Sequence, residues 1–315
     1  MQLQRLIAGS ILCVAGIHLI GHVSAAKAQD EIDRPMDVPV SAVLEVKADG
    51  SVTDAWIVAI GVWHDDDALQ DVLRDQHPLT DGEAGWASLI LGRTSTWSRM
   101  TDSLQLPFGA TAPPNAVYIA LGNVGGQDAF TFSDTSIGFD LRMLHDLYGV
   151  ASEEENGDRI DRFFAHEFTH LMHKSWQKAN DVMLTSALDR ALWECLVEGL
   201  GNYRSLSGRW IDPDRALTQH ALDVLGRLER VFTDRIEALE HATLSESEAL
   251  MEGISSGAFD QKWGALTVAL FLSQEAKGDD RRLRKWVDAG PQGVLALARK
   301  YLPEDLRARI PAPRD

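Results

Sequence analysis

The sequence predicts an α+β fold, in which a mixed N-terminal part precedes a mainly helical C-terminal part. Before residue 141, short apolar runs of strand length alternate with helical patterns and with turn signals such as Asp49-Gly50. After residue 141, apolar residues recur at the spacing of amphipathic helices. This change predicts an N-terminal mixed α/β subdomain at residues 29–140 and a helical subdomain at residues 141–315.

Residues 1–28 are predicted to be a secretory signal peptide. Arg5 supplies a positive charge, residues 6–23 are mostly apolar, and Ala26-Lys27-Ala28 forms an A-x-A cleavage site. Glycine and histidine residues interrupt the apolar stretch and weaken it as a membrane span, although an uncleaved N-terminal anchor is the alternative. We therefore expect a secreted or periplasmic protein without stable membrane association after cleavage. The sequence leaves the oligomeric state open.

The charge balance is acidic, with 30 basic and 47 acidic residues and a net charge of −17. Such a surface favours solubility and repels the phosphates of nucleic acid and anionic membranes, so neither is an expected partner. Cys195 is the only cysteine outside the predicted signal peptide, so no disulfide is expected within the mature chain. Because no catalytic partner for it is apparent, we expect Cys195 to be a buried helical residue.

The elements of the N-terminal part are predicted from apolar runs and turn residues. Expected strands are residues 40–46, 55–63, 116–121, 130–132 and 136–141, and expected helices are residues 68–73 and 85–104. The acidic run Asp65-Asp66-Asp67 is expected to cap the first of these helices, with a calcium site as the alternative.

In the C-terminal part, residues 153–157 are expected to form a charged loop. Helices are predicted at residues 158–176, 184–203, 213–239, 263–272 and 294–301, where Pro213 marks the start of the third helix.

One helical stretch, residues 163–173, carries the strongest chemical signal. It reads Phe-Phe-Ala-His-Glu-Phe-Thr-His-Leu-Met-His and contains H-E-x-x-H. Because residues four apart lie on one face of a helix, His166 and His170 can direct two imidazoles at one metal ion. Glu167 can then take a proton from a metal-bound water without binding the ion. Apolar flanks indicate a buried helix, whose polar side chains need partners. We therefore predict a zinc (Zn2+) site for metal-assisted hydrolysis, with a chance match as the alternative.

A third ligand must come from elsewhere, because catalytic zinc takes three protein ligands. The metzincin pattern is excluded, since His173 and Trp176 stand where it requires glycine and histidine. His173 is expected to be a core histidine or to support a ligand. The stretch 193–203, Trp-Glu-Cys-Leu-Val-Glu-Gly-Leu-Gly-Asn-Tyr, resembles the third-ligand helix of gluzincin metallopeptidases. Residues 163–203 as a whole resemble the core of this clan and are similar to secreted bacterial proteins predicted to be zinc-dependent proteases.

The resemblance implies a zincin-like fold with the active-site cleft between the two subdomains. It implies Zn2+ bound by His166, His170 and Glu198, and hydrolysis of a peptide or protein substrate with Glu167 as the general base. The competing third ligand is Glu194, one turn earlier, in which case Glu198 would orient a histidine. A zinc hydrolase with a non-peptide substrate and a non-catalytic binding protein on the same scaffold are the alternative functions.

The resemblance also implies a tyrosine or histidine that stabilises the oxyanion formed during hydrolysis. The candidates are Tyr203, His220 and His241, and the sequence does not choose between them. In the clan, a strand upstream of the zinc helix binds substrate through backbone pairing. Residues 136–141 are the candidate for this edge strand.

Overall fold

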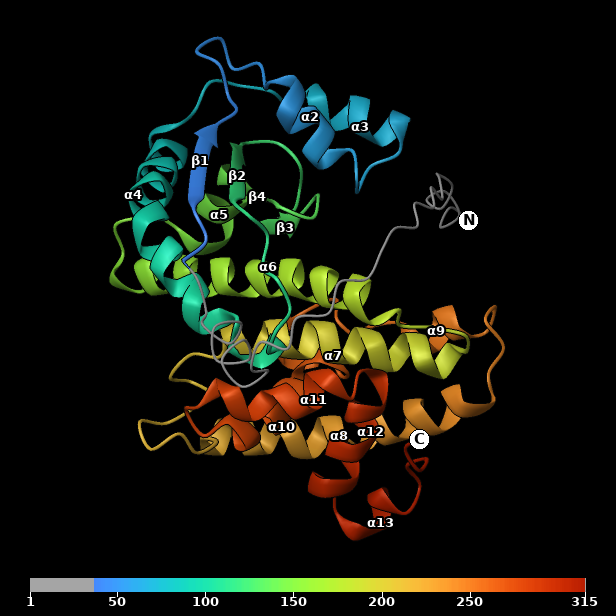
Figure 1. Ribbon diagram of the computed structural model, residues 1–315. Helices are drawn as coiled ribbons and strands as arrows, with labels where there is room; N and C mark the ends of the chain where they lie inside the picture. The colour runs from blue at the N-terminus through green and yellow to red at the C-terminus, as the bar shows by residue number, and fades with distance from the viewer. Residues whose placement is uncertain (1–36, 315) are drawn as a thin grey trace, which may run out of the picture. The chain divides into compact units, whose positions relative to one another are not determined.

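The computed structural model describes residues 37–314, which adopt an α+β fold (Figure 1). The predicted signal peptide lies outside the described residues. Within the described part, none of the helices is both long enough and apolar enough to cross a membrane.

A four-stranded mixed sheet forms the β part. Its strands are β1 (Val40–Leu44), β2 (Val117–Gly122), β3 (Ala129–Thr131) and β4 (Ser136–Asp140), in the order β1-β2-β4-β3. Both β1 and β4 run parallel to β2, whereas β3 pairs antiparallel with β4. These four strand predictions are confirmed within a few residues. The prediction of residues 136–141 as the edge strand is wrong, because β4 is hydrogen-bonded on both sides, and β3 is the edge strand next to it.

The prediction of a strand at residues 55–63 is also wrong, because helix α2 (Asp54–Ile60) forms there. A short continuous apolar run does not distinguish a buried strand from a buried helix. The helix is selected by its start, where the Thr53 hydroxyl accepts a hydrogen bond from the Trp56 backbone N–H and Asp54 complements the helix dipole. In the next helix, α3 (Asp66–Leu73), the Asp65 carboxylate caps the N–H of Ala68, which confirms the capping interpretation.

Helix α4 (Asp81–Leu104) confirms the predicted helix and begins four residues earlier, after a Thr80 capping box. The Trp97 ring on α4 stacks on Phe164, with 4.7 Å between ring centroids, and on Phe139 of β4 at 6.0 Å. This stack connects α4, the sheet and the helix that carries H-E-x-x-H. The short helix α5 (Leu141–Tyr148) follows β4 directly.

The C-terminal part is helical, as predicted. Its helices are α6 (Glu154–Asn180), α7 (Ala187–Ser205), α8 (Gln219–His241), α9 (Ser247–Met251), α10 (Ala265–Ala276), α11 (Arg284–Asp288), α12 (Pro291–Tyr301) and α13 (Glu304–Arg307). The short 3-10 turns are η1 (Leu106–Phe108), η2 (Phe259–Gln261) and η3 (Asp280–Leu283). Helix α6 lies between the sheet and α7, and α7 packs on α10 on its other side (Figure 1).

Two predicted boundaries in this part are wrong. Residues 154–157, expected in a loop, form the first turn of α6, where Glu154 and Glu155 complement the helix dipole. Helix α8 begins at Gln219 and not near Pro213, because the Thr218 hydroxyl caps the N–H of Ala221. Pro213 lies in the turn before it, which the hydrogen bond from the N–H of Asp212 to the carbonyl of Ala216 closes.

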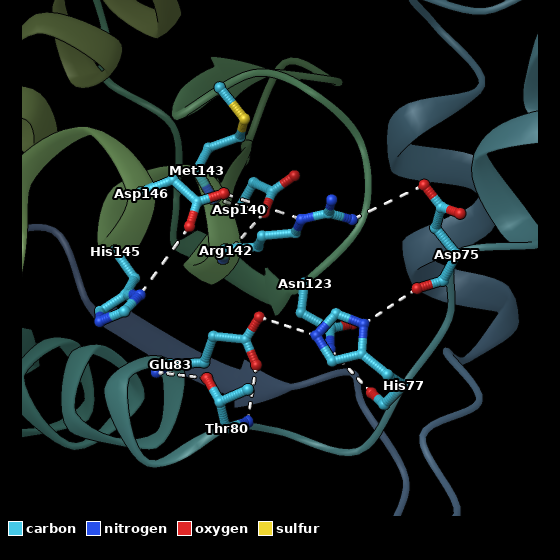
Figure 2. Close-up of polar contacts among 10 residues, drawn as sticks. All are labelled: Asp75, His77, Thr80, Glu83, Asn123, Asp140, Arg142, Met143, His145 and Asp146. Carbon is cyan, nitrogen blue, oxygen red and sulfur yellow. Dashed lines mark hydrogen bonds and ion pairs between the residues drawn. The ribbon is translucent and has the colours of Figure 1, made fainter.

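A buried carboxylate, Glu83, connects the start of α4 to the segment before it (Figure 2). Its Oε2 accepts the Thr80 N–H at 2.7 Å, and its Oε1 lies 3.0 Å from Nε2 of His77. The Nδ1 atom of His77 lies 2.9 Å from the carbonyl oxygen of Asp75. Both ring nitrogens therefore face acceptors. The Asp75 carbonyl, and then the Glu83 carboxylate, raise the pKa of His77 above its ordinary value.

Because the pKa of His77 is raised in the folded state, its stabilising contribution is complete below the ordinary histidine pKa of about 6.5 and is lost as the pH rises through the folded-state value. We expect His77→Gln to remove this decline in the free energy of unfolding, measured by urea denaturation between about pH 5 and pH 9. The matched control is His145→Gln, because His145 also packs on α4 but lies 3.9 Å from an exposed carboxylate, that of Asp146. An unchanged decline in His77→Gln would contradict the assignment.

Candidate metal centre

Helix α6 presents His166, Glu167 and His170 near its middle. The neighbouring Phe164 and Phe168 are fully buried in the core and hold this part of the helix in place. The two imidazole rings lie 4.6 Å apart between centroids, at an angle of 77°. One potential ligand atom from each of His166, Glu167 and His170 lies within 4.8 Å of the others, so this group is able to hold a metal ion.

Helix α7 brings the carboxylate of Glu198 to both imidazoles. Its Oε1 lies 3.5 Å from Nε2 of His170, and its Oε2 lies 3.7 Å from Nε2 of His166. Both separations exceed the usual N–H···O hydrogen bond of about 2.7–3.2 Å. Zinc binds nitrogen and oxygen ligands at about 2.0–2.2 Å, so neighbouring ligands in a tetrahedral site lie about 3.3–3.5 Å apart. The spacing of these three side chains therefore fits a shared metal ion better than direct hydrogen bonds.

The carboxylate of Glu194, the competing ligand, is hydrogen-bonded to a residue outside the candidate ligand set. Its Oε1 accepts a hydrogen bond from the Ser255 hydroxyl at 2.6 Å. Burial raises the pKa of Glu194, and this hydrogen bond acts against the shift. Within residues 37–314, Glu198 is the carboxylate of α7 that lines the cavity above His166 and His170, and Glu194 does not line it. The geometry thus favours Glu198 as the predicted third ligand.

The protonation states of these side chains suit metal binding. Burial lowers the pKa of His166 well below its ordinary value and also lowers that of His170, so both imidazoles are neutral, as metal ligation requires. Burial raises the pKa of Glu167 well above its ordinary value, and the negative charge of Glu198 adds to this shift. The positive charge of a bound ion would act on Glu167 in the opposite direction.

A serine on α7 orients the first histidine. The Ser205 hydroxyl lies 3.2 Å from Nδ1 of His166 and 3.4 Å from the carbonyl oxygen of Gly201. A neutral His166 with its proton on Nδ1 would donate to the Ser205 hydroxyl oxygen, whose own proton is directed at the Gly201 carbonyl. This tautomer leaves the lone pair of Nε2 directed toward Glu198, which is the usual role of a hydrogen bond behind a metal ligand.

The two glycines of the Glu-Gly-Leu-Gly stretch have separate packing roles. A Cβ at Gly201 would lie 2.9 Å from Cε1 and Nε2 of His166, so only glycine leaves room for the imidazole. A Cβ at Gly199 would lie 2.6 Å from Cγ1 of Val268 on α10. Gly201 therefore admits the ligand, whereas Gly199 admits the supporting helix.

The three predicted oxyanion candidates lie away from this centre. The Tyr203 hydroxyl donates a hydrogen bond to Asp280 at 2.6 Å, and Tyr203 lines a separate pocket of ≈ 310 Å³. His220 packs on Trp210 with 4.8 Å between ring centroids, and His241 is exposed in the last turn of α8. None of the three is among the described residues that line the metal cavity.

His173 is a buried core histidine, which confirms that expectation. Its ring packs edge-on against Phe108 at 4.9 Å and against Trp193 at 5.8 Å between centroids. Burial lowers the pKa of His173 to about 3, so its imidazole is neutral. Cys195 is also fully buried, as expected.

The cavity has a volume of ≈ 1260 Å³ and extends from the metal centre to the sheet. All three residues of the edge strand β3 line it. Lys174, one turn after His170, ties that strand to α6, because its Nζ donates to Thr131 Oγ1 and to the carbonyl oxygen of Ser133, both at 3.1 Å. Lys262, from the loop before α10, lines the cavity as well. No local motif marks the strand or Lys262 in the sequence, whereas the helical spacing from His170 places Lys174 on the same face.

A scan against protein-family models and searches of curated proteins and of solved structures gave no match to this chain. The candidate metal centre rests on geometry alone: two packed helices bring two neutral imidazoles and a carboxylate together beside a second, buried carboxylate.

We expect Gly201→Ala to lower zinc affinity about 10–100-fold, the usual effect of disturbing a group behind a metal ligand, because the new methyl group must displace the His166 imidazole. The matched control is Gly226→Ala in α8, where a Cβ would meet nothing within 4 Å. That control should keep its zinc affinity and gain about 0.5–1 kcal/mol in stability. Competition with a chromophoric chelator measures the affinity, and equal values for both variants would refute the packing role of Gly201.

The choice of third ligand is tested by comparing Glu198→Ala with Glu194→Ala. We expect Glu198→Ala to lose zinc as severely as His170→Ala, since each removes one of three protein ligands. Glu194→Ala should retain most of the metal, because its carboxylate is bonded to Ser255. Zinc content after dialysis against trace chelator is the measurement, and a larger loss from Glu194→Ala would move the ligand one turn back along α7.

Proposed function

We propose that this protein is a zinc-dependent peptidase, exported to the periplasm or the medium, with a zincin-like cleft between the sheet-containing part and the helical part. The observation that carries this proposal is the approach of the Glu198 carboxylate to both imidazoles of the H-E-x-x-H helix, at 3.5 and 3.7 Å. Zn2+ held by His166, His170 and Glu198 would supply a Lewis acid that polarises a carbonyl group and acidifies water.

In this proposal Glu167 moves the proton. Its carboxylate accepts a proton from the attacking water and delivers it to the leaving amine. A base is most effective when its pKa lies near the pH of the reaction, and burial beside Glu198 shifts the pKa of Glu167 in that direction. The Nδ1–H bond of His166 to Ser205 keeps the ligand nitrogen unprotonated during this transfer.

The cavity supports a peptide over a small non-peptide substrate. Its volume of ≈ 1260 Å³ exceeds the range of about 300–1,000 Å³ that is usual for small-molecule pockets. Its wall includes the whole of β3, and an extended peptide can bind to such an edge through main-chain hydrogen bonds. In this proposal β3, and not the predicted strand at residues 136–141, is the edge strand that pairs with the substrate backbone.

The alternative of a non-catalytic binding protein on the same scaffold leaves Glu167 without a role. Three ligands are sufficient to hold zinc, and an ionisable carboxylate buried beside them is costly to desolvate. The presence of Glu167 at this point therefore favours hydrolysis over binding alone.

We expect Glu167→Gln to fold and to retain zinc, but to hydrolyse peptides about 10²–10⁴-fold more slowly, because glutamine keeps the shape of the side chain and cannot act as a base. Hydrolysis of a peptide mixture is followed by mass spectrometry, with zinc content and thermal stability measured on the same preparation. The exposed carboxylate of Glu240 on α8 provides the matched control, Glu240→Gln. Undiminished hydrolysis would exclude Glu167 as the base, and loss of zinc would show that Glu167 is a ligand.

A further inference from the structure

The metal cavity contains a cation without an ion-pair partner. Lys262 follows the turn η2 and lines the same cavity as His166, His170 and Glu198. Across residues 37–314, no carboxylate lies within ion-pair distance of its ammonium group and no hydrogen bond from it is formed. The ammonium group lies over the face of the Phe259 ring, with 5.8 Å from Nζ to the ring centroid.

Most of the other cations that line the cavity are already engaged; the exception is Arg209, an exposed side chain that likewise has no ion-pair partner among residues 37–314. Lys174 is hydrogen-bonded to Thr131 and Ser133, and both Arg159 and Arg162 pair with Glu155. These interactions fix the three charges on the walls of the cavity. The Lys262 ammonium thus lines the cavity with its N–H donors free to bind a ligand.

The charge of Lys262 acts on all three groups of the H-E-x-x-H motif. Its positive charge acts on His166, on Glu167 and on His170, whereas the charge of Lys174 acts on Glu167 and His170 alone. Lys262 therefore lines the same cavity as the base and the two histidine ligands, and the reach of its charge is consistent with this position.

The backbone that carries Lys262 is firmly held. Its carbonyl oxygen accepts the N–H of Leu266 in α10 at 2.9 Å, and the next residue, Trp263, is buried with its indole N–H bonded to the carbonyl oxygen of Glu252 at 2.9 Å. The same loop is tied to α7 through the hydrogen bond from Ser255 to Glu194. Such anchoring limits the motion of Lys262 to its own side chain and pre-organises the charge.

Hydrolysis at this centre requires a donor for the oxyanion, and Tyr203, His220 and His241 do not line the cavity. We propose, on the basis of the peptidase function above, that Lys262 stabilises the oxyanion of the scissile carbonyl. Water oxygen bonds to the carbonyl carbon while Glu167 takes its proton, and the C=O π pair moves onto oxygen. The Lys262 ammonium donates a hydrogen bond to that oxygen. The oxyanion then re-forms C=O as the C–N bond breaks, and Glu167 protonates the amine.

The test uses the zinc-loaded full chain and a peptide selected by digestion of a mixture with the unmodified protein. Lys262→Met keeps the length of the side chain but removes its charge and donors. We expect kcat to fall about 10²–10³-fold, as for loss of an oxyanion donor, with zinc content unchanged and KM little altered. Lys262→Arg should recover part of the loss, because it restores a cationic donor. The exposed Lys47 gives the control, Lys47→Met, which removes one positive charge outside the cavity and should leave kcat unchanged.

A phosphinic peptide provides a second readout, because its tetrahedral anion resembles the transition state. Its affinity should fall in parallel with kcat/KM in Lys262→Met, while the affinity of an uncleaved substrate in the Glu167→Gln background stays constant. Unchanged kcat in Lys262→Met would overturn the role of Lys262 and leave the peptidase function standing. A rise in KM with kcat unchanged would also overturn it, by assigning Lys262 to substrate binding. If the unmodified protein binds zinc but neither cleaves peptides nor binds the phosphinic peptide, the peptidase function itself is refuted.

Discussion

The packing of four ionisable side chains between α6 and α7, with Glu167 buried and the other three partly buried, is the constraint on which the site depends. Each of His166, Glu167, His170 and Glu198 is costly to remove from water unless another group compensates for the lost hydration. The nitrogen and oxygen atoms that face one another are too far apart to satisfy this need by hydrogen bonding. A shared cation is the economical solution, and the absence of a side chain at Gly201 lets the helices approach closely enough to share it.

Helices α10 and α12 support α7 from the side opposite to α6 (Figure 1). Helix α10 packs on α7 at Gly199 and carries the buried Glu275. Burial alone would raise the pKa of Glu275, but the donors of Lys300, Tyr301, Lys285 and Trp286 lower it to about 2. One carboxylate thereby joins α10 to α11 and α12. The wall that supports the ligand helix is held by charged hydrogen bonds as well as by apolar packing.

The features that the sequence predicted are those set by spacing within one helix. The four-residue interval places His166 and His170 on one face of α6, and the Glu-Gly-Leu-Gly stretch places Glu198 near Gly201, which leaves room for the His166 ring. The helical C-terminal part followed from the same periodicity. The apolar run within residues 55–63 does not distinguish a strand from a helix, because six consecutive apolar residues carry no periodicity, and the cap at Thr53 is the signal that decides for the helix.

Features that depend on contacts between distant segments cannot be predicted from the sequence. Whether β4 or β3 forms the edge depends on the order of strands in the sheet, which no single strand encodes. Lys262 reaches the cavity because its loop folds back onto α7, far along the chain from His170. The resemblance indicates the residue type of the oxyanion donor but not its position in space. In the fold, the Tyr203 hydroxyl donates a hydrogen bond to Asp280 and does not reach the cavity.

The stack of Trp97 on Phe139 and Phe164 has a consequence for how the protein loses its structure. The three rings belong to α4, to β4 and to the helix that carries the ligands, and they lie in a core that continues without a break from Val38 to Ile310. Because the sheet and the helices share this core, unfolding of either one exposes apolar surface of the other. The shared core thus couples the unfolding of the metal-ligand helix to that of the sheet.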